Sequence, residues 1–222
     1  MKRSFAFGFG GVLMLAMACG GASQAPQQSK RATPLAHAVL ASDASRCDTQ
    51  GSDREVSEYD TSGDNRPDVR RVYRRMGDPP AVRLILVCRE VDLDGDGRKD
   101  MVRYYNDEGR PLREEADRDF DGQIDALTFF QEGRIVRQEF DTNADGRIDT
   151  KLFFDDEGKP FRAERDLTGR STPSEWKPDR WEYYEQGHLV RIGIDIDGDG
   201  RVDRWERRSE EERRLATGAE ES

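Results

Sequence analysis

One short motif recurs four times in this chain, and its residues have the types and spacing that hold a hard metal cation. Each copy has Asp or Asn at its first, third and fifth positions, Gly at its sixth and Asp at its ninth. Carboxylates at alternate positions repel one another unless a cation lies among them, and glycine permits the turn that lets them converge. The copies are Asp92–Asp100, Asp117–Asp125, Asp141–Asp149 and Asp195–Asp203.

We predict that each copy binds one calcium ion through five oxygen ligands. The side chains of positions one, three, five and nine and the backbone carbonyl of position seven supply them. Calcium accepts this density of hard oxygen ligands, whereas magnesium requires a tighter octahedral shell. A single copy could be a metal-free Asp-Gly turn, but four copies in register favour about four calcium sites. The predicted ligands are Asp92, Asp94, Asp96, Arg98 and Asp100; Asp117, Asp119, Asp121, Gln123 and Asp125; Asp141, Asn143, Asp145, Arg147 and Asp149; and Asp195, Asp197, Asp199, Arg201 and Asp203.

The first six positions of each motif resemble the calcium loop of the EF hand, but the resemblance ends before position twelve. An EF-hand loop has a bidentate glutamate there. The copies have Arg103, Thr128 and Leu152, and only the last copy has a glutamate, Glu206. The Gly-x-x-Asp ending is similar to the cation loops of integrin α-subunit propellers and thrombospondin type 3 repeats. That resemblance covers the nine-residue loops alone and implies structural, extracellular calcium sites.

Two weaker copies extend the series to about six units. The copy Asp60–Asp68 has Ser62 and Asn65 at its third and sixth positions, which leaves metal binding there open. The copy that begins at Asp166 has Thr168 and Arg170 in place of carboxylates and runs into an insertion. We expect this copy to bind no metal.

The segments between the motifs also repeat, with a period of 24 or 25 residues in the central part of the chain. Each motif is followed by a short alternating run with an aromatic pair, a glycine turn and a second alternating run. Runs of this length between turn residues predict strands. We therefore predict an all-β fold, an elongated antiparallel β-meander of hairpin units with calcium loops along one edge. Strand spacing would place successive loops about 10 Å apart.

Residues two apart on a strand share a face, which predicts the two faces of this sheet. We expect the oppositely charged pairs to form an exposed ladder and the apolar pairs to form the face that packs. The charged pairs are Arg113/Glu115, Arg137/Glu139 and Arg162/Glu164, and the apolar pairs are Val102/Tyr104, Leu127/Phe129 and Trp181/Tyr183.

Composition supports a thin repeat array rather than a thick core. The 222 residues are 34% hydrophobic and 37% charged, with a net charge of −10. This polarity leaves little apolar surface for a two-layer core, while a stack of units can bury a thin strip. The negative charge argues against a nucleic-acid partner.

The N-terminal segment has the features of an export signal. Lys2 and Arg3 precede an apolar stretch that ends at residue 18, too short for a comfortable membrane span. The site before Cys19 resembles the lipobox of bacterial lipoproteins, although Ala16 stands where leucine is usual. Cleavage after Ala-x-Ala by ordinary signal peptidase is the alternative. We predict a signal peptide over residues 1–18.

The lipoprotein resemblance implies a lipid on Cys19 and therefore a membrane partner. Gly20 stands where an acidic inner-membrane retention residue would be, which implies the outer membrane of a Gram-negative cell envelope. The arrangement also resembles predicted surface lipoproteins of such bacteria. We expect residues 19–45 to form the anchor and a flexible tether, 46–208 the β-repeat domain and 209–222 a charged tail.

Two further cysteines, Cys47 and Cys88, are expected to form a disulfide in an exported protein, with buried free thiols as the alternative. Catalytic groups are scarce: His37 and His188 lack a neighbouring motif for nucleophilic or zinc chemistry. We expect no enzyme. The sequence favours a calcium-stiffened platform for binding, adhesion or envelope assembly, with a protein or glycan partner. A calcium-dependent enzyme acting on polysaccharide is the alternative.

Overall fold

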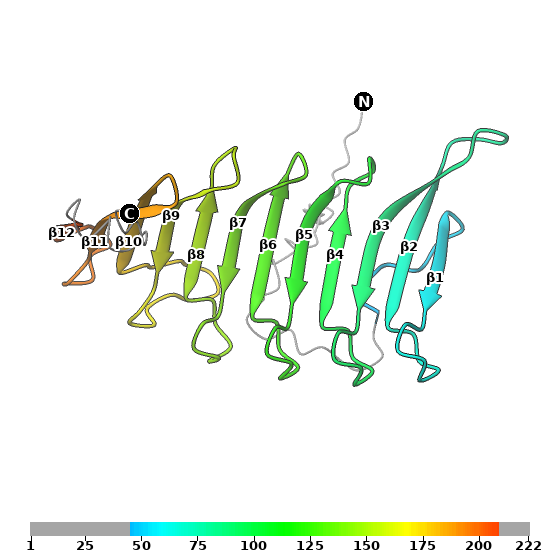
Figure 1. Cartoon of the computed structure of the whole chain (residues 1–222), viewed down its shortest axis with the longest axis horizontal. Coiled ribbons are helices and arrows are strands. Elements are labelled where there is room, and N and C mark those ends of the chain that lie inside the picture. Colours follow the sequence, from blue (N-terminus) through cyan, green and yellow to red (C-terminus); the bar gives the residue numbers. More distant parts are fainter. Residues whose placement is uncertain (1–44, 209–222) are drawn as a thin grey trace, which may run out of the picture. The chain divides into compact units, whose positions relative to one another are not determined.

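The described part of the chain is one open antiparallel sheet of twelve strands that follow one another in chain order (Figure 1). The computed structural model describes residues 45–208, and this range contains no helix. The strands are β1 (Arg54–Tyr59), β2 (Val69–Met76), β3 (Arg83–Val91), β4 (Met101–Tyr105), β5 (Pro111–Ala116), β6 (Ala126–Gln131), β7 (Arg134–Phe140), β8 (Thr150–Phe154), β9 (Pro160–Arg165), β10 (Arg180–Glu185), β11 (His188–Ile194) and β12 (Arg204–Arg207). The predicted all-β meander is confirmed.

Several predicted segments fall outside residues 45–208. These are the signal segment 1–18, the lipidation site Cys19, all but the last residue of the tether 19–45 and the charged tail 209–222. Within the described range, no segment forms an apolar helix of the length needed to cross a membrane.

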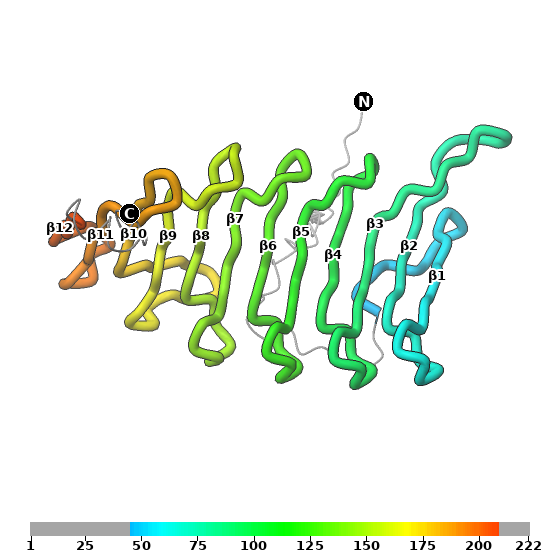
Figure 2. The backbone as a smooth tube through the Cα atoms, in the orientation of Figure 1, coloured from blue at the N-terminus to red at the C-terminus, as the bar shows by residue number. Residues whose placement is uncertain are grey.

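The connections between strands alternate between the two ends of the sheet, as the backbone trace shows (Figure 2). Short turns leave β2, β4, β6, β8 and β10 at one end, and the acidic motifs leave the other strands at the opposite end. In the turn Glu132-Gly133 the φ angles are 51° and 80°. Two successive positive φ angles define the hairpin geometry that matches the right-handed twist of strands. The predicted turn edge and acidic-loop edge are therefore confirmed.

Each adjacent aromatic pair lies at an irregularity of the sheet near a hairpin turn. The register shifts between Tyr104 and Tyr105 and again between Phe129 and Phe130. The pairs at 153–154 and 183–184 repeat the shift. A bulge of this kind adds a residue to one strand and increases the local twist. It explains why two aromatic residues interrupt an otherwise alternating pattern.

The Arg–Glu pairs share one face of the sheet with the apolar pairs, so the expected exposed ladder on a separate face is wrong. Residues paired across neighbouring strands point to the same side. Glu115 pairs with both Val102 and Leu127, and Arg137 pairs with Phe129. The guanidinium carbon of Arg137 lies 4.1 Å from the ring centroid of Phe129. Arginines therefore cover aromatic rings, and Glu115 beneath them is 0% exposed.

The first described residues, Ser45–Cys47, form a strap across this face. Cys47 forms a disulfide with Cys88 on β3, as predicted, with 5.7 Å between the Cα atoms. The backbone N–H groups of Arg46 and Cys47 donate to the buried carboxylate of Glu90, the latter over 3.0 Å. The Arg46 guanidinium pairs with Glu115. These contacts offset the cost of removing two carboxylates from water.

A second cover over the same face comes from the insertion within residues 171–178. The indole N–H of Trp176 donates to Glu164 over 2.6 Å, and Lys151 Nζ lies 4.3 Å from the Trp176 ring centroid. Trp205 on the last strand is 47% exposed and stacks on Arg191, whose guanidinium carbon is 4.4 Å from the ring centroid. Trp176 and Trp205 therefore both pack against charged side chains.

The apolar core is a thin strip made of two small clusters. One surrounds the disulfide and contains Cys47, Val72, Cys88 and Val102. In the other, Ile124 and Ile148, each the eighth residue of an acidic motif, pack with Leu127 and Phe129. Leu127 is 1% exposed. Because the acidic loops supply part of the core, their conformation contributes to the stability of the sheet.

Removal of the strap arginine tests the role of the buried carboxylates. We expect Arg46→Ala to lower the free energy of unfolding by about 2 kcal/mol, because Glu115 loses a charged partner at a site without water. Urea unfolding at pH 7 measures the loss. Arg75→Ala is the control, since Arg75 and its partner Glu55 are 54% and 42% exposed. The control should change stability by less than about 0.5 kcal/mol, and equal losses would contradict the assignment.

Candidate metal centre

Six acidic loops lie in a row along one edge of the sheet (Figure 1). We number them loop 1 (60–68), loop 2 (92–100), loop 3 (117–125), loop 4 (141–149), loop 5 (166–179) and loop 6 (195–203). The N–H of the first residue in each loop donates to the carbonyl of the last residue in the preceding loop. These bonds are Asp92 to Asp68, Asp117 to Asp100, Asp141 to Asp125, Asp166 to Asp149 and Asp195 to Asp179, at 2.7–2.9 Å. Neighbouring loops are therefore joined directly through the backbone.

Two aspartates close each loop by accepting backbone hydrogen bonds. In loop 2 the N–H groups of Gly95 and Gly97 donate to Asp92 over 2.7 and 2.9 Å. The N–H of Leu93 donates to Asp100 over 2.6 Å. Loops 1, 3, 4 and 6 repeat donation from the sixth residue to the first aspartate and from the second residue to the ninth. The first and ninth aspartates thus have a structural role in addition to the ligand role predicted for them.

The fourth position of the motif adopts a left-handed backbone that sequence reasoning did not identify. Phe120 and Ala144 hold it with φ of 62° and 57°, and glycine holds it in loops 1, 2 and 6. Left-handed backbone is costly for residues other than glycine, so the loop closure must compensate at those two positions. The frequent glycine at the fourth position was the available signal.

The structure brings the predicted carboxylates together in three of the four strong loops. Oxygen atoms from three aspartates lie within 4.8 Å of one another in each of loops 2, 3 and 6. The groups are Asp92, Asp94 and Asp96; Asp117, Asp119 and Asp125; and Asp195, Asp197 and Asp199. Three predicted carboxylate ligands lie outside these groups: the ninth-position Asp100 and Asp203, which accept the N–H of Leu93 and Ile196, and the fifth-position Asp121, which accepts the N–H of Gln123.

Loop 4 differs because its third position is an amide, while its fifth position pairs with the arginine at its seventh, as Asp96 pairs with Arg98 in loop 2. The guanidinium of Arg147 donates to Asp145 over 3.0 Å. This hydrogen bond, together with the Arg147 charge, holds the pKa of Asp145 below its usual range. Asn143 donates to the same carboxylate over 3.4 Å. No group of three acidic ligands forms among Asp141, Asp145 and Asp149 in the described geometry.

Each predicted seventh-position ligand donates its backbone N–H to the fifth-position aspartate of its own loop, at 2.7–3.0 Å. These residues are Arg98, Gln123, Arg147 and Arg201.

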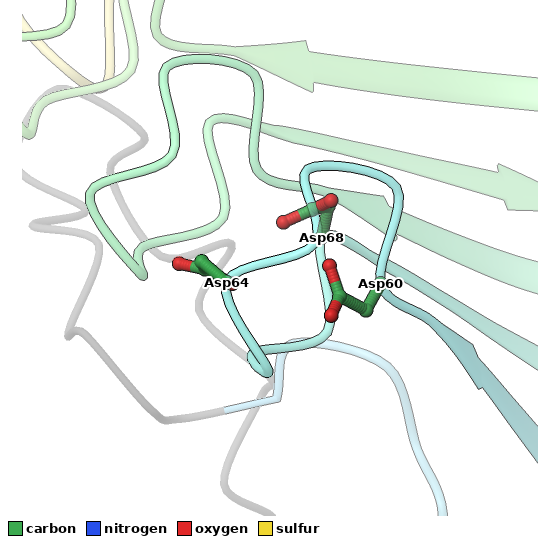
Figure 3. A group of neighbouring side chains, drawn as sticks. All are labelled: Asp60, Asp64 and Asp68. Atoms are coloured by element: carbon green, nitrogen blue, oxygen red, sulfur yellow. The ribbon is translucent and has the colours of Figure 1, made fainter.

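Loop 1 is a candidate site that the sequence left open. Asp60, Asp64 and Asp68 have oxygen atoms within 4.8 Å of one another, and Figure 3 shows the three side chains around this loop. Thr61 donates to Asp68 through both its N–H and its hydroxyl, over 2.6 and 2.5 Å. These hydrogen bonds hold the pKa of Asp68 below its usual range. The retained aspartates at positions one, five and nine were the signal for this group.

Loop 3 fits a bound cation best, because it contains a buried oxygen without a partner. Oδ1 of Asp117 has no hydrogen bond, and the residue is 1% exposed. Burial raises the pKa of Asp117, the N–H groups of Gly122 and Phe120 lower it, and nearby aspartates raise it further. The Phe120 N–H lies near this carboxylate but does not form a hydrogen bond with Oδ1. An oxygen donor set with an unpaired buried member suits a hard cation.

Loop 5 keeps the shape of the other loops without their central carboxylates. Asp179, beyond the insertion, takes the ninth-position role and accepts the N–H of Leu167 and of Thr168 over 3.1 and 2.8 Å. Asp166 accepts the N–H of Arg170 over 2.8 Å. The side chains at the third and fifth positions are Thr168 and Arg170, so this loop offers two carboxylates where the others offer three or more.

Comparison with known families identifies one of the loops. The EF hand family matches residues 138–151, which include loop 4 and parts of β7 and β8. The match covers the loop and short flanks that are strands, whereas EF-hand loops lie between helices. No curated protein matches the chain.

Solved structures give only weak likenesses. The accessory secretory proteins 1, 2 and 3 of Streptococcus pneumoniae are 16% identical, with a TM-score of 0.34 over 53% of this chain and 19% of that one. The Gap123 complex of Streptococcus agalactiae is 14% identical, with a TM-score of 0.31 over 65% and 23%. A protein of unknown function from Bacteroides fragilis is 13% identical, with a TM-score of 0.17 over 64% and 93%. The chain thus spans about a fifth of the first of these structures.

Substitution of two buried ninth-position aspartates tests whether each has a structural role alone or also a role as a metal ligand. We expect Asp179→Ala in loop 5 to lower the free energy of unfolding by about 2 kcal/mol, because three donors lose their acceptor. The loss should be the same in calcium and in EDTA. Asp100→Ala in loop 2 should lose a similar amount in EDTA and roughly 1.4 kcal/mol more at about 1 mM calcium. Urea unfolding measures both, and a calcium-dependent loss for Asp179→Ala would contradict a metal-free loop 5.

Proposed function

We propose that this protein is a calcium-binding lipoprotein of a Gram-negative cell envelope, in which calcium stiffens the sheet as a platform for binding, adhesion or envelope assembly. The acidic clusters and the EF hand match suggest binding of calcium or a similar metal ion. The observation that carries the proposal is the unpaired, buried Oδ1 of Asp117 inside a cluster of carboxylates.

The residues that would hold the ions are the aspartates of loops 1, 2, 3 and 6, with loop 4 contributing through Asp141, Asn143 and Asp149. A bound cation supplies positive charge among carboxylates that otherwise repel one another. Since the eighth residue of loops 3 and 4 packs in the core strip, charge neutralisation in these loops would also stabilise the adjoining strands.

Magnitudes favour a structural role for the metal over a signalling role. Extracellular calcium modules bind with Kd values of about 10⁻⁴ to 10⁻³ M. At about 1 mM calcium, a site with a Kd of about 10⁻⁴ M adds roughly 1.4 kcal/mol to stability. Four such sites would add roughly 5 to 6 kcal/mol, which is comparable with the whole stability of a small domain.

The proposed location rests on the N-terminal sequence and the disulfide. Disulfides persist in oxidising compartments outside the cytoplasm, and Cys47 is bonded to Cys88. The resemblance of the site before Cys19 to a lipobox supports a lipid anchor. In this proposal the partner is a protein or glycan of the envelope, nucleic acid is disfavoured by the net charge of −10, and the chain is not an enzyme.

Calcium titration tests the central part of the proposal. We expect the chelated protein to take up about four calcium ions in calorimetry and to melt at a lower temperature in EDTA. Asp121→Ala should remove about one equivalent, because a fifth-position ligand of loop 3 is lost. Asp156→Ala, in the exposed turn between β8 and β9, is the control and should leave uptake unchanged. Absence of uptake by the unmodified protein would overturn the proposal.

Replacement of the proposed lipidation site tests the location. We expect Cys19→Ser to move the protein from the membrane fraction to the soluble fraction of the envelope, because the lipid supplies the membrane affinity. Fractionation with metabolic labelling by a radioactive fatty acid measures both effects. A protein that stays soluble and unlabelled with Cys19 intact would contradict the anchor. Glycan turnover by the purified protein that EDTA abolishes would instead favour the enzymatic alternative.

A further inference from the structure

A side chain of loop 5 reaches across to loop 6 and binds one of its acidic residues. Nη2 of Arg170 donates to Oδ2 of Asp195 over 3.1 Å, and the Asp195 side chain is 0% exposed. Asp195 is the first-position aspartate of loop 6 and belongs to its group of converging carboxylates. A positive charge from the preceding loop is therefore already present beside a predicted calcium ligand.

The pairing of Arg170 with Asp195 differs from the contacts that arginines of other loops make with the next loop. The seventh-position arginines Arg66, Arg98 and Arg147 also point at the next loop. Their guanidinium nitrogens lie 3.4, 2.9 and 3.5 Å from where a Cβ would stand on the facing glycines, Gly97, Gly122 and Gly169. Arg98 and Arg147 form their ion pairs with Asp96 and Asp145 of their own loops, and none of the three forms an ion pair within 4 Å with a carboxylate of the next loop. Within residues 45–208, Asp195 is the one first-position aspartate with an ion pair to an arginine of the preceding loop.

The Arg170 guanidinium lies directly against loop 6. A Cβ added at Gly198 would collide with Arg170 Nη1, so the guanidinium packs on the loop backbone. The backbone of Arg170 is tied to loop 5, because its N–H donates to Asp166 over 2.8 Å. A positive charge therefore lies beside Asp195 before any metal ion enters loop 6.

We propose that Arg170 acts as a tethered cation for loop 6, so that this loop forms without metal and binds calcium more weakly than loops 2 and 3. The inference rests on the proposed calcium-binding function. Asp195 must be shared between the guanidinium and the ion, and two positive charges at such short range repel. Loop 5 has no third carboxylate and contributes Arg170 instead. The contact between loops 5 and 6 therefore includes a positive charge that belongs to the protein itself.

Terbium luminescence of the purified chain tests this assignment. Terbium replaces calcium at oxygen sites, and Trp205, two residues beyond loop 6, can sensitise an ion bound there. We expect Arg170→Gln to tighten terbium binding at the Trp205-sensitised site on the order of tenfold, because loss of one charge-assisted hydrogen bond frees Asp195. Competition with calcium should give the same ratio. Trp205→Phe identifies the part of the signal that belongs to loop 6.

Two variants control for charge and for folding. Arg180→Gln removes one positive charge from the adjoining strand β10, where Arg180 pairs with Glu182 over 2.7 Å rather than with a loop. It should leave terbium affinity at loop 6 within about twofold of the unmodified chain. Arg170→Lys retains the charge and should keep the weak affinity. Circular dichroism establishes that each variant is folded.

The outcomes distinguish the inference from the function on which it rests. If the unmodified chain takes up neither terbium nor calcium, both are wrong. If the chain binds but Arg170→Gln leaves the loop 6 affinity unchanged or weakens it, the tethered-cation role alone is overturned. Equal tightening by Arg170→Gln and Arg180→Gln would also overturn it, because the effect would then follow from overall charge.

Discussion

Repulsion between carboxylates is the constraint on which the rest of this structure depends. A sheet that buries only a thin apolar strip has little hydrophobic free energy to offset unpaired charge. On the covered face, glutamates such as Glu115 are buried beside arginines that lie over aromatic rings. At the loop edge, backbone N–H groups from elsewhere in the loop donate to the first and ninth aspartates, whereas a central carboxylate accepts the N–H of the residue two positions further on. The covered face thus balances its carboxylates with arginines, and the loop edge would balance its carboxylates with the metal ions proposed above.

The sequence predicted the elements of this fold because each signal was local. Alternating runs and glycine turns determine strands, and a constant period determines an antiparallel meander with two unlike edges. Which side chains of neighbouring strands share a face of the sheet could not be predicted from single strands. Arg113/Glu115 and Leu127/Phe129 each share a face of their own strand, but whether the two strands present those pairs to the same side depends on their mutual register. The register arises from the hairpin bulges and from loop closure, which a single strand does not reveal.

In the candidate site, too, features within one loop were predictable from the sequence and contacts between loops were not. Spacing alone identified the carboxylates that converge in loops 2, 3 and 6, and the substitutions in loop 1 obscured a group that the backbone assembles regardless of Ser62 and Asn65. The pairing of Arg170 with Asp195 joins residues 25 positions apart across a joint, and no motif encodes it. Asp179, in contrast, follows the insertion where the motif pattern resumes in the sequence, and it takes the ninth-position role.

That insertion has a consequence for how such a chain can change over evolutionary time. Loop 5 lacks the central carboxylates of the other loops and contains extra residues, yet β9 and β10 pair in an ordinary antiparallel register, with Arg165 opposite Arg180. Asp166 and Asp179 accept backbone hydrogen bonds at its two ends as in the other loops, so the segment between them can vary in length. Trp176 illustrates the result, because the added residues fold back over the sheet. Each acidic loop is thus a position where residues can be inserted while the neighbouring strands keep their pairing.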